Sequence, residues 1–437
     1  MNEATPEAKE LLPRNLGLWG IWLLVINGFI GSGIFGLPAG ATRLAGAWSP
    51  LIYIACALLI LPIVLCFSEA ASYYRGTGGP IRYATDTYGR FIGFQTGWLY
   101  YIARVVAFSA GSVLLVDSIS YFWPEANQGH WRWILLAIIC FGMTAINVIG
   151  NVRAIRSLGV FTVLKFIALL GLVILGVFML ELPGIEAMQQ SAISTDLASL
   201  DLGGAILLLM YAYVGFESAT VPAGEARNPA RDMPRALLLG TLVAGLLYLC
   251  IQLVSMAALP DLADTSTPLL DVAAVLFGET GAVLLMAGLV ASVGGNLLGA
   301  IFSSPRMSYA LGLDGSLPAW FAVVHPRFLT PANSIVFFGV VSFLLAAFGS
   351  FIWLAAISVL ARLFVYIVTC SAVPVLRRQH EGAAAFRMKG GLLVPALGIL
   401  GCLGLLVQVS RDSLLVTLMF AIFGTLLYWL AQRANKV

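Results

Sequence analysis

Long apolar blocks alternate with short polar segments along almost the whole chain. Twelve of these blocks are close to or longer than the roughly 20 residues that a helix needs to cross the hydrocarbon core of a bilayer. Their ranges are 17–45, 50–74, 91–122, 131–150, 157–181, 200–224, 236–260, 281–312, 333–350, 351–377, 391–409 and 411–432. The pattern predicts an all-α integral membrane protein in which each block forms one transmembrane helix.

The composition supports a membrane protein and the charges orient it. The chain has 437 residues, of which 60% are hydrophobic and 10% are charged, and its mean hydropathy is +0.95. The first sixteen residues lack the features of a cleaved secretory signal, so helix 1 should be retained. Eighteen of the 24 Lys and Arg residues fall on the side of the N-terminus, which predicts that both termini are cytoplasmic. We therefore expect a multi-pass protein surrounded by the lipid of a cell membrane, in a bacterium the inner membrane.

The remaining chemistry excludes several classes of protein. The basic residues are spread over seven short loops, so a nucleic-acid partner is not expected. The six cysteines lie within predicted spans without metal-ligand or redox spacing, and the three histidines lie in loops. No nucleophile elbow, zinc-helix pattern or phosphate-binding loop is present. We expect no enzyme activity, no cofactor and no metal site.

Two of the predicted helices contain residues that interrupt a helix. Helix 1 carries Gly31-Ser32-Gly33 in the stretch NGFIGSGIFGLPAG. Helix 6 places Gly215 and Glu217 at mid-membrane, followed by Pro222 and Gly224. Close helix packing is one explanation for such small residues. The alternative is a pair of broken helices, because transporters built from inverted repeats interrupt corresponding helices of their two halves.

These interruptions divide the chain into two sets of five spans, the first opened by helix 1 and the second by helix 6. We expect a cytoplasmic tail at 1–16, a first five-helix repeat at 17–182 and an inverted second repeat at 200–378. Helices 11 and 12 follow at 391–432, and a cytoplasmic tail at 433–437 ends the chain.

Broken helices offer backbone groups to a ligand. Where helix 1 restarts, N–H groups are unpaired and the positive end of the helix dipole favours a carboxylate. Where the first half of helix 6 stops, carbonyl groups are free to accept hydrogen bonds from an ammonium group. The N–H groups are those of Ser32, Gly33 and Ile34, and the carbonyls are those of Tyr211, Ala212 and Val214. Together the two ends suit a zwitterion.

Three motifs also carry a resemblance to a known family. The stretches IGSGIFGLPA in helix 1, YVGFES with EARNPARDMPRA at helix 6, and SSPRMSYALGLDGSLPAW after helix 8 resemble the amino acid, polyamine and organocation transporter superfamily. The resemblance implies a LeuT-type fold with 12 transmembrane helices, in which helices 1 and 6 are unwound at mid-membrane. It implies that the unwound segments, here including Ile30 to Ile34 and Tyr211 to Phe216, hold the backbone of an amino acid. It also implies alternating access by rocking of helices 1, 2, 6 and 7.

Five ionisable residues lie at bilayer depth, where each needs a pathway or a partner: Glu69, Arg104, Lys165, Glu217 and Arg362. For Glu217, burial favours the protonated form, so it is a candidate proton carrier or gate. The alternative is a structural acceptor that caps free amide groups of the unwound stretch.

Lys165 should point inward at the carbonyl groups of the helix 1 break, because facing lipid would be costly. In the resemblance, a helix 5 lysine stands where sodium binds in sodium-driven relatives, which argues against sodium coupling. The alternative is a charge-balancing partner of Glu217 or Glu69.

Arg104 lies in helix 3, which lines the side-chain pocket in the family that the chain resembles. A guanidinium group there would repel a cationic side chain and bind an acidic one. An ion pair with Glu69 or Asp117 is the alternative. We treat Arg362 as structural. The other candidate pocket residues are Tyr211, Phe216, Phe108, Asn296 and Ser358.

These features predict a secondary transporter that moves a neutral, possibly acidic, amino acid by proton symport or exchange. The competing function on the same fold is a carrier of amines, polyamines or cationic amino acids. A channel or a substrate-sensing receptor is the alternative from another class. The loop 181–199 is a solvated segment or a docking place for a partner subunit.

Overall fold

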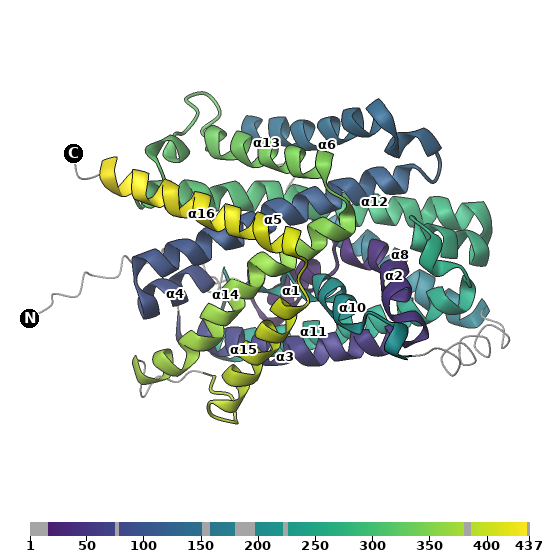
Figure 1. Ribbon diagram of the computed structural model, residues 1–437, viewed down its shortest axis with the longest axis horizontal. Helices are drawn as coiled ribbons and strands as arrows, with labels where there is room; N and C mark the ends of the chain where they lie inside the picture. The colour runs from purple at the N-terminus through teal and green to yellow at the C-terminus, as the bar shows by residue number, and fades with distance from the viewer. Residues whose placement is uncertain are drawn as a thin grey trace, which may run out of the picture.

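The computed structural model describes residues 16–74, 78–150, 158–179, 197–221, 226–379 and 386–434. Within these ranges the secondary structure is helical, apart from an isolated bridge between Leu16 and Ala226 (Figure 1). The α-helices are α1 (Leu18–Phe29), α2 (Gly33–Ala45), α3 (Ser49–Tyr73), α4 (Pro80–Tyr88), α5 (Arg90–Ile119), α6 (Gly129–Ile149), α8 (Leu158–Met179), α10 (Leu202–Leu209), α11 (Pro229–Ala258), α12 (Pro268–Leu313), α13 (Ala332–Phe348), α14 (Phe351–Gln379), α15 (Leu393–Val407) and α16 (Arg411–Ala434).

The helices match the predicted blocks. Eight helical segments of the described residues are long and apolar enough to cross a membrane by length and composition, and four shorter apolar helices accompany them. Each predicted span overlaps an α-helix; the span at 17–45 is divided between α1 and α2, and the span at 200–224 contains α10 followed by two 3-10 turns. The span predicted at 281–312 lies within α12, whose first part is set off by Gly278 at φ 71°.

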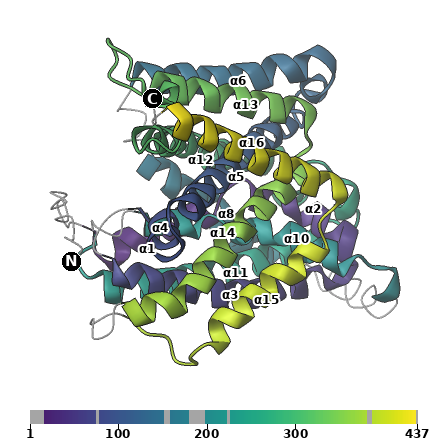
Figure 2. The same ribbon diagram turned by 60° about the vertical axis from the view of Figure 1, so that its left-hand side comes forward.

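Buried and lipid-facing helices differ in their side chains. Helix α5 packs against α14, α12, α4 and α13, and its Trp98 is fully buried. Helices α6 and α13 lie side by side at one edge of the bundle (Figures 1 and 2). Helix α16 exposes large apolar residues such as Met419 and Trp429. Because such surfaces suit hydrocarbon rather than water, the outer helices are those expected to face lipid.

The first predicted span, residues 17–45, which we call helix 1, is interrupted between α1 and α2. Helix α1 ends at Phe29 and α2 begins at Gly33. Helix 6 is interrupted as well: α10 ends at Leu209, and short 3-10 turns run over Met210–Tyr213 and Phe216–Thr220. Between these two turns, Gly215 has a φ of 108°, a conformation that favours glycine. Both interruptions predicted from the sequence are therefore present in the backbone.

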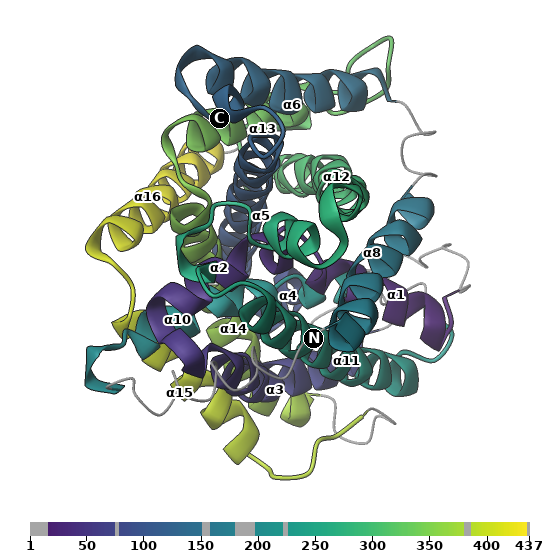
Figure 3. The ribbon, with the colours of Figure 1, turned by 90° about the vertical axis from the view of Figure 1, so that its right-hand side faces the viewer.

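Other helices surround the two breaks. Helix α11 packs against both α1 and α8, and Figure 3 shows these three helices together on one side of the bundle. Helix α14 packs against α3 and α5. The first fifteen residues, Pro222, Gly224, the loop from 181 to 196 and the last three residues lie outside the described ranges.

Candidate functional site

The two breaks lie directly against each other. A Cβ atom added to Gly28 would lie 2.5 Å from the carbonyl oxygen of Gly215, so the two backbones are in contact. The hydroxyl groups of Ser32 and Tyr211 are 3.0 Å apart, which links the two breaks by a hydrogen bond. Glycine at both contact positions is what allows this approach, since a side chain would push the segments apart.

Helix α2 presents its N-terminus at the first break. The N–H groups of Phe35 and Gly36 bond to the carbonyl of Ser32, as expected for the first turn of a helix. The N–H groups of Ser32, Gly33 and Ile34 precede that turn and have no backbone acceptor among the described residues. These are the N–H groups that the sequence predicts for a carboxylate, and that role stays a prediction.

The carbonyl groups of the second break are not all free. The Tyr248 hydroxyl of α11 lies 3.0 Å from the carbonyl oxygen of Ala212 and 2.8 Å from that of Phe29. The prediction that Ala212 offers a free carbonyl is therefore wrong. The Tyr248 hydroxyl has one proton, which the two carbonyl oxygens share, so the buried Ala212 carbonyl already has a donor from the protein. The carbonyls of Tyr211 and Val214 remain as candidate acceptors.

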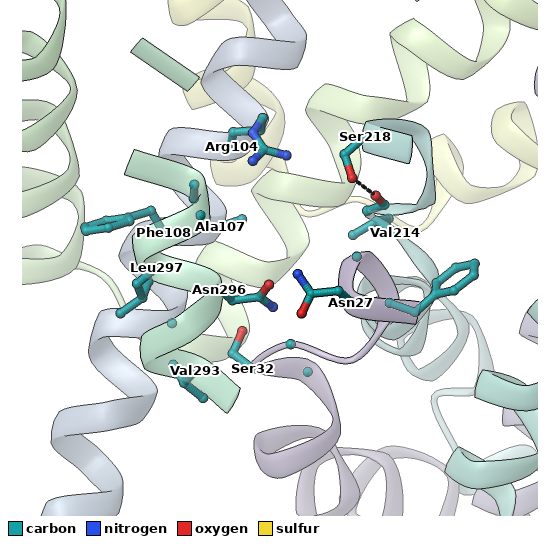
Figure 4. A pocket seen from close by; sticks show the side chains of 18 of the residues that line it. Asn27, Ser32, Arg104, Ala107, Phe108, Val214, Ser218, Val293, Asn296 and Leu297 are labelled. Carbon is teal, nitrogen blue, oxygen red and sulfur yellow. Dashed lines mark hydrogen bonds between the residues drawn. The ribbon is translucent and has the colours of Figure 1, made fainter. Parts of the chain in front are cut away.

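A cavity of about 350 Å³ lies beside the breaks (Figure 4). That volume falls in the range of small-molecule sites. Nine of the predicted site residues line it: Gly31, Ser32, Gly33, Arg104, Phe108, Tyr211, Val214, Gly215 and Asn296. Seven are not among its lining residues: Ile30, Ile34, Lys165, Ala212, Phe216, Glu217 and Ser358.

Two of these seven have clear packing roles. Phe216 is buried with its ring 5.8 Å from Phe29 and 5.7 Å from Tyr366. Ser358 donates to the carbonyl of Ala103 in α5 at 3.0 Å. Both side chains therefore join neighbouring helices to one another.

Several cavity residues escaped the sequence analysis, and Asn27 is the most informative. Its side chain faces Asn296 across the middle of the cavity (Figure 4). Asn27 lies in the last turn of α1, immediately before the Gly-rich break. A polar residue at that position in an apolar helix was the available signal. Ser218, Ser303, Val293 and Leu297 also line the cavity without a comparable signal.

Lys165 points at the first break, as predicted. Its Nζ atom lies 2.7 Å from the carbonyl oxygen of Ile30 and 2.6 Å from Oδ1 of Asn27, and the residue is buried. The alternative of an ion pair with Glu217 or Glu69 is wrong, because other cations occupy both carboxylates. Lys165 thus binds the carbonyl dipole that α1 leaves exposed, and it orients the Asn27 amide.

Glu217 and Arg362 form a buried ion pair. The distance from Arg362 Nε to Glu217 Oε1 is 2.8 Å, and the side chains are 3% and 0% exposed. Glu217 also accepts the N–H of Gly215 at 2.8 Å and the hydroxyl of Tyr366 at 3.2 Å. These contacts match the interpretation of Glu217 as an acceptor that caps an amide of the unwound stretch. Arg362 is its partner from α14 and also lines the cavity.

Arg104 has no carboxylate partner in the described part of the chain. Its Nε donates to Ser304 Oγ at 2.6 Å and its Nη2 to Ser303 Oγ at 2.8 Å. The alternative of an ion pair with Glu69 or Asp117 is wrong, since Glu69 pairs with Arg377 at 2.6 Å and Asp117 with Arg132 at 3.2 Å. The guanidinium group borders the cavity at the end opposite Ser32 (Figure 4).

Comparison with known proteins gives a consistent match over the chain. A family model described as amino acid permease matches residues 16–428. The chain is 25% identical to the branched-chain amino acid permease BcaP of Bacillus subtilis (strain 168), over 99% of this chain and 96% of that protein. It is 27% identical to the methylthioribose transporter of the same organism, over 98% and 95%. It is 26% identical to the serine/threonine exchanger SteT, also of that organism, over 89% and 90%.

Proposed function

Since the chain belongs to the amino acid permease family, whose members are transporters and not enzymes, we propose that it carries an amino acid across the membrane by alternating access. The observation that supports this most directly is that two broken helices abut and border one cavity of about 350 Å³. In this proposal the helices form a LeuT-type arrangement of two inverted five-helix repeats followed by two further helices. Both termini lie in the cytoplasm of a bacterial cell.

The cavity suits the two charged ends of an amino acid. The α-carboxylate binds the N–H groups at the start of α2, where the helix dipole adds a favourable charge. The α-ammonium binds the carbonyls of Tyr211 and Val214, because the carbonyl of Ala212 is already occupied. An amine or a carboxylic acid alone would satisfy one end and leave the other unpaired.

The side-chain part of the cavity mixes apolar and amide groups. Phe108, Val293 and Leu297 line one wall, and the amides of Asn27 and Asn296 face each other across the centre. Arg104 adds a positive charge, which disfavours arginine, lysine and polyamines as substrates. We propose a neutral or acidic amino acid, and a carrier of amines or polyamines is the competing proposal on this fold.

We propose that coupling uses protons or exchange and does not use sodium. The ammonium group of Lys165 occupies the carbonyl of Ile30, where a cation would otherwise bind. A proton-driven cycle through Glu217 predicts that Glu217→Gln no longer accumulates substrate in response to a pH gradient. Full pH-gradient-driven accumulation by a folded Glu217→Gln protein would show that Glu217 is not the proton carrier, whereas a wild-type protein whose uptake ignores the pH gradient would favour exchange.

Two experiments test the proposal. Thermal stability of the purified protein is first measured with each of the twenty amino acids and with common amines, because a ligand of the folded state raises it. The ligand found is then used for counterflow in proteoliposomes. Uptake that accelerates when unlabelled substrate is trapped inside supports a carrier. Uptake that is independent of trapped substrate would indicate a channel, and binding without any flux would indicate a sensing receptor.

A further inference from the structure

Arg104 lies where two cavities meet. The cavity beside the helix breaks and a second cavity of about 630 Å³ share three lining residues, namely Arg104, Ser218 and Ser303. The second cavity is also lined by α4 and by the last turns of α12. The distribution of Lys and Arg predicts that this end faces the cytoplasm. A molecule that moves between the two cavities passes the guanidinium group of Arg104.

The other arginine side chains that line these two cavities have partners within the protein. Arg362 is paired with Glu217. In the second cavity, Arg82 lies 3.7 Å from Asp86, and the guanidinium group of Arg306 is bonded to the carbonyl of Phe302 and rests on its ring at 3.6 Å. Arg362 and Arg82 are therefore paired with carboxylates, whereas Arg306 is held by a carbonyl and an aromatic ring.

The charge of Arg104 has neutral partners. Its Nε and Nη2 atoms bond to the two serine hydroxyls of α12, which hold one edge of the guanidinium group in place. The ring of Tyr100 lies 6.0 Å from the central carbon. The edge formed by Nη1 and Nη2 has no carboxylate among the described residues. The Tyr100 side chain also has a hydrogen bond with Arg104. The N–H donors that remain on the guanidinium group are of the kind that binds a carboxylate.

Ser32 and Arg104 lie at opposite ends of the cavity beside the breaks (Figure 4). The N-terminus of α2 therefore offers one place for a carboxylate, and Arg104 offers another on the way to the second cavity. A carboxylate that left the α2 amides would meet the amides of Asn27 and Asn296, but among the described residues that line this cavity only Arg104 offers a cation without a carboxylate partner, and an uncompensated buried charge is costly.

We propose that Arg104, held by Ser303 and Ser304, is a transit site for carboxylates, which receives the α-carboxylate of the substrate as it passes between the two cavities. This inference rests on the proposed function. The group that Arg104 would bind is a carboxylate. The experiment distinguishes the α-carboxylate, which every amino acid has, from the side-chain carboxylate of an acidic amino acid. A transit site acts on every amino acid that the protein carries and acts from the α4 side of the membrane.

The test compares transport from the two faces in right-side-out and inside-out membrane vesicles. For Arg104→Gln, the KM of a neutral amino acid presented from the α4 side should rise about tenfold, as expected for a lost charge-assisted hydrogen bond. The KM from the opposite side should change less than about twofold, because that route reaches the α2 amides first. Arg306→Gln is the matched control, since it removes the same charge from the second cavity, and its KM values should stay near those of the wild type.

Each other outcome overturns the transit site. An effect of Arg104→Gln confined to aspartate and glutamate, equal from both sides, would assign Arg104 to side-chain recognition in the cavity beside the breaks. Unchanged KM values would remove any role in carboxylate binding. An equal effect of Arg306→Gln on the KM would indicate that the overall positive charge of the second cavity matters and that Arg104 is no specific site. If Arg104→Gln does not reach the membrane, Ser303→Ala with Ser304→Ala frees the guanidinium group and should give the same one-sided effect, smaller in size.

Amino acid transport and the transit site can be refuted independently of each other. A wild-type protein that carries no amino acid in counterflow would refute amino acid transport itself. Wild-type transport with symmetric behaviour of Arg104→Gln would refute only the transit site.

Discussion

The two helix breaks are stabilised in different ways. At the first break, the cation of Lys165 binds two neutral acceptors, the carbonyl of Ile30 and the amide oxygen of Asn27. At the second, the carboxylate of Glu217 accepts a backbone N–H and is paired with the cation of Arg362. The first break therefore binds a cation through dipoles alone, whereas the second contains a complete ion pair.

This difference shows which groups remain for a substrate. Unpaired backbone at bilayer depth is tolerated where the protein or a watery cavity satisfies it. Here α8, α11 and α14 bring polar side chains to the breaks, among them Lys165, Tyr248 and Arg362. Some of the groups that they satisfy belong to residues that line the cavity, such as Asn27 and Phe29. Ser32, Gly33, Tyr211 and Val214 line the cavity, and our proposal is that their remaining backbone groups bind the ligand.

The largest effect should come from the ion pair at the second break. Arg362→Gln or Glu217→Gln leaves one buried charge without its partner, which should lower the free energy of unfolding by about 3–5 kcal/mol. Denaturation of the purified protein in detergent measures the loss. The double variant should recover part of the stability, because no unpaired charge remains. Single variants as stable as the wild type would contradict a structural role of the pair.

A somewhat smaller loss is expected at the first break. Lys165→Met removes both hydrogen bonds of the ammonium group and leaves the carbonyl of Ile30 and the amide oxygen of Asn27 with only the longer contacts from Asn296 and Thr162, which should cost about 2–4 kcal/mol. The same denaturation assay checks this, and Lys389→Met in an exposed position is the control that should leave stability unchanged. A stable Lys165→Met protein that transports normally would show that the first break needs no cation.

The contact between the breaks can be tested through glycine. In Gly215→Ala, the added Cβ would meet the backbone of Gly28 and the residue would keep a positive φ, so we expect a loss of about 2 kcal/mol together with weaker substrate binding. Gly294→Ala is the control in α12, where open space surrounds the added Cβ, and it should keep or raise stability. If both variants behave alike, close approach of the two backbones is not required.

The smallest effect should come from Tyr248, whose hydroxyl contacts a carbonyl of each break. Tyr248→Phe removes the hydroxyl near the carbonyls of Phe29 and Ala212, which should lower stability by about 1 kcal/mol. It should also leave the carbonyl of Ala212 free, as the sequence alone suggested. Substrate binding measured by calorimetry should change little, because Ala212 does not line the cavity. A large gain or loss of affinity would show that this carbonyl takes part in binding.

The sequence predicted the helices and the breaks well, for clear physical reasons. Hydrophobic length is a strong signal, and each predicted span overlaps an α-helix of the described residues. The Gly-Ser-Gly stretch and Gly215 marked the interruptions, since glycine is costly in a regular helix. The motifs also identified the superfamily, which the family match confirms.

Side-chain pairing was harder to predict, because it depends on which helices become neighbours. The sequence placed Lys165 at the first break, since a lysine at that depth must face inward. It did not pair Glu217 with Arg362, which lies 145 residues away. It offered Glu69 and Asp117 as partners for Arg104, but Arg377 and Arg132 occupy them. Asn27 was missed because one amide in an apolar helix carries little information without its neighbours.

The most direct test of the account is calorimetric binding of one transported amino acid and its two truncated analogues to the purified protein. One analogue is the amine that lacks the carboxylate, and the other is the acid that lacks the amino group. If opposed helix ends bind the two poles of one molecule, the amino acid should bind and each analogue should bind at least about a hundredfold more weakly, as expected when a buried charged partner is left unpaired. Equal affinity of either analogue would contradict the account.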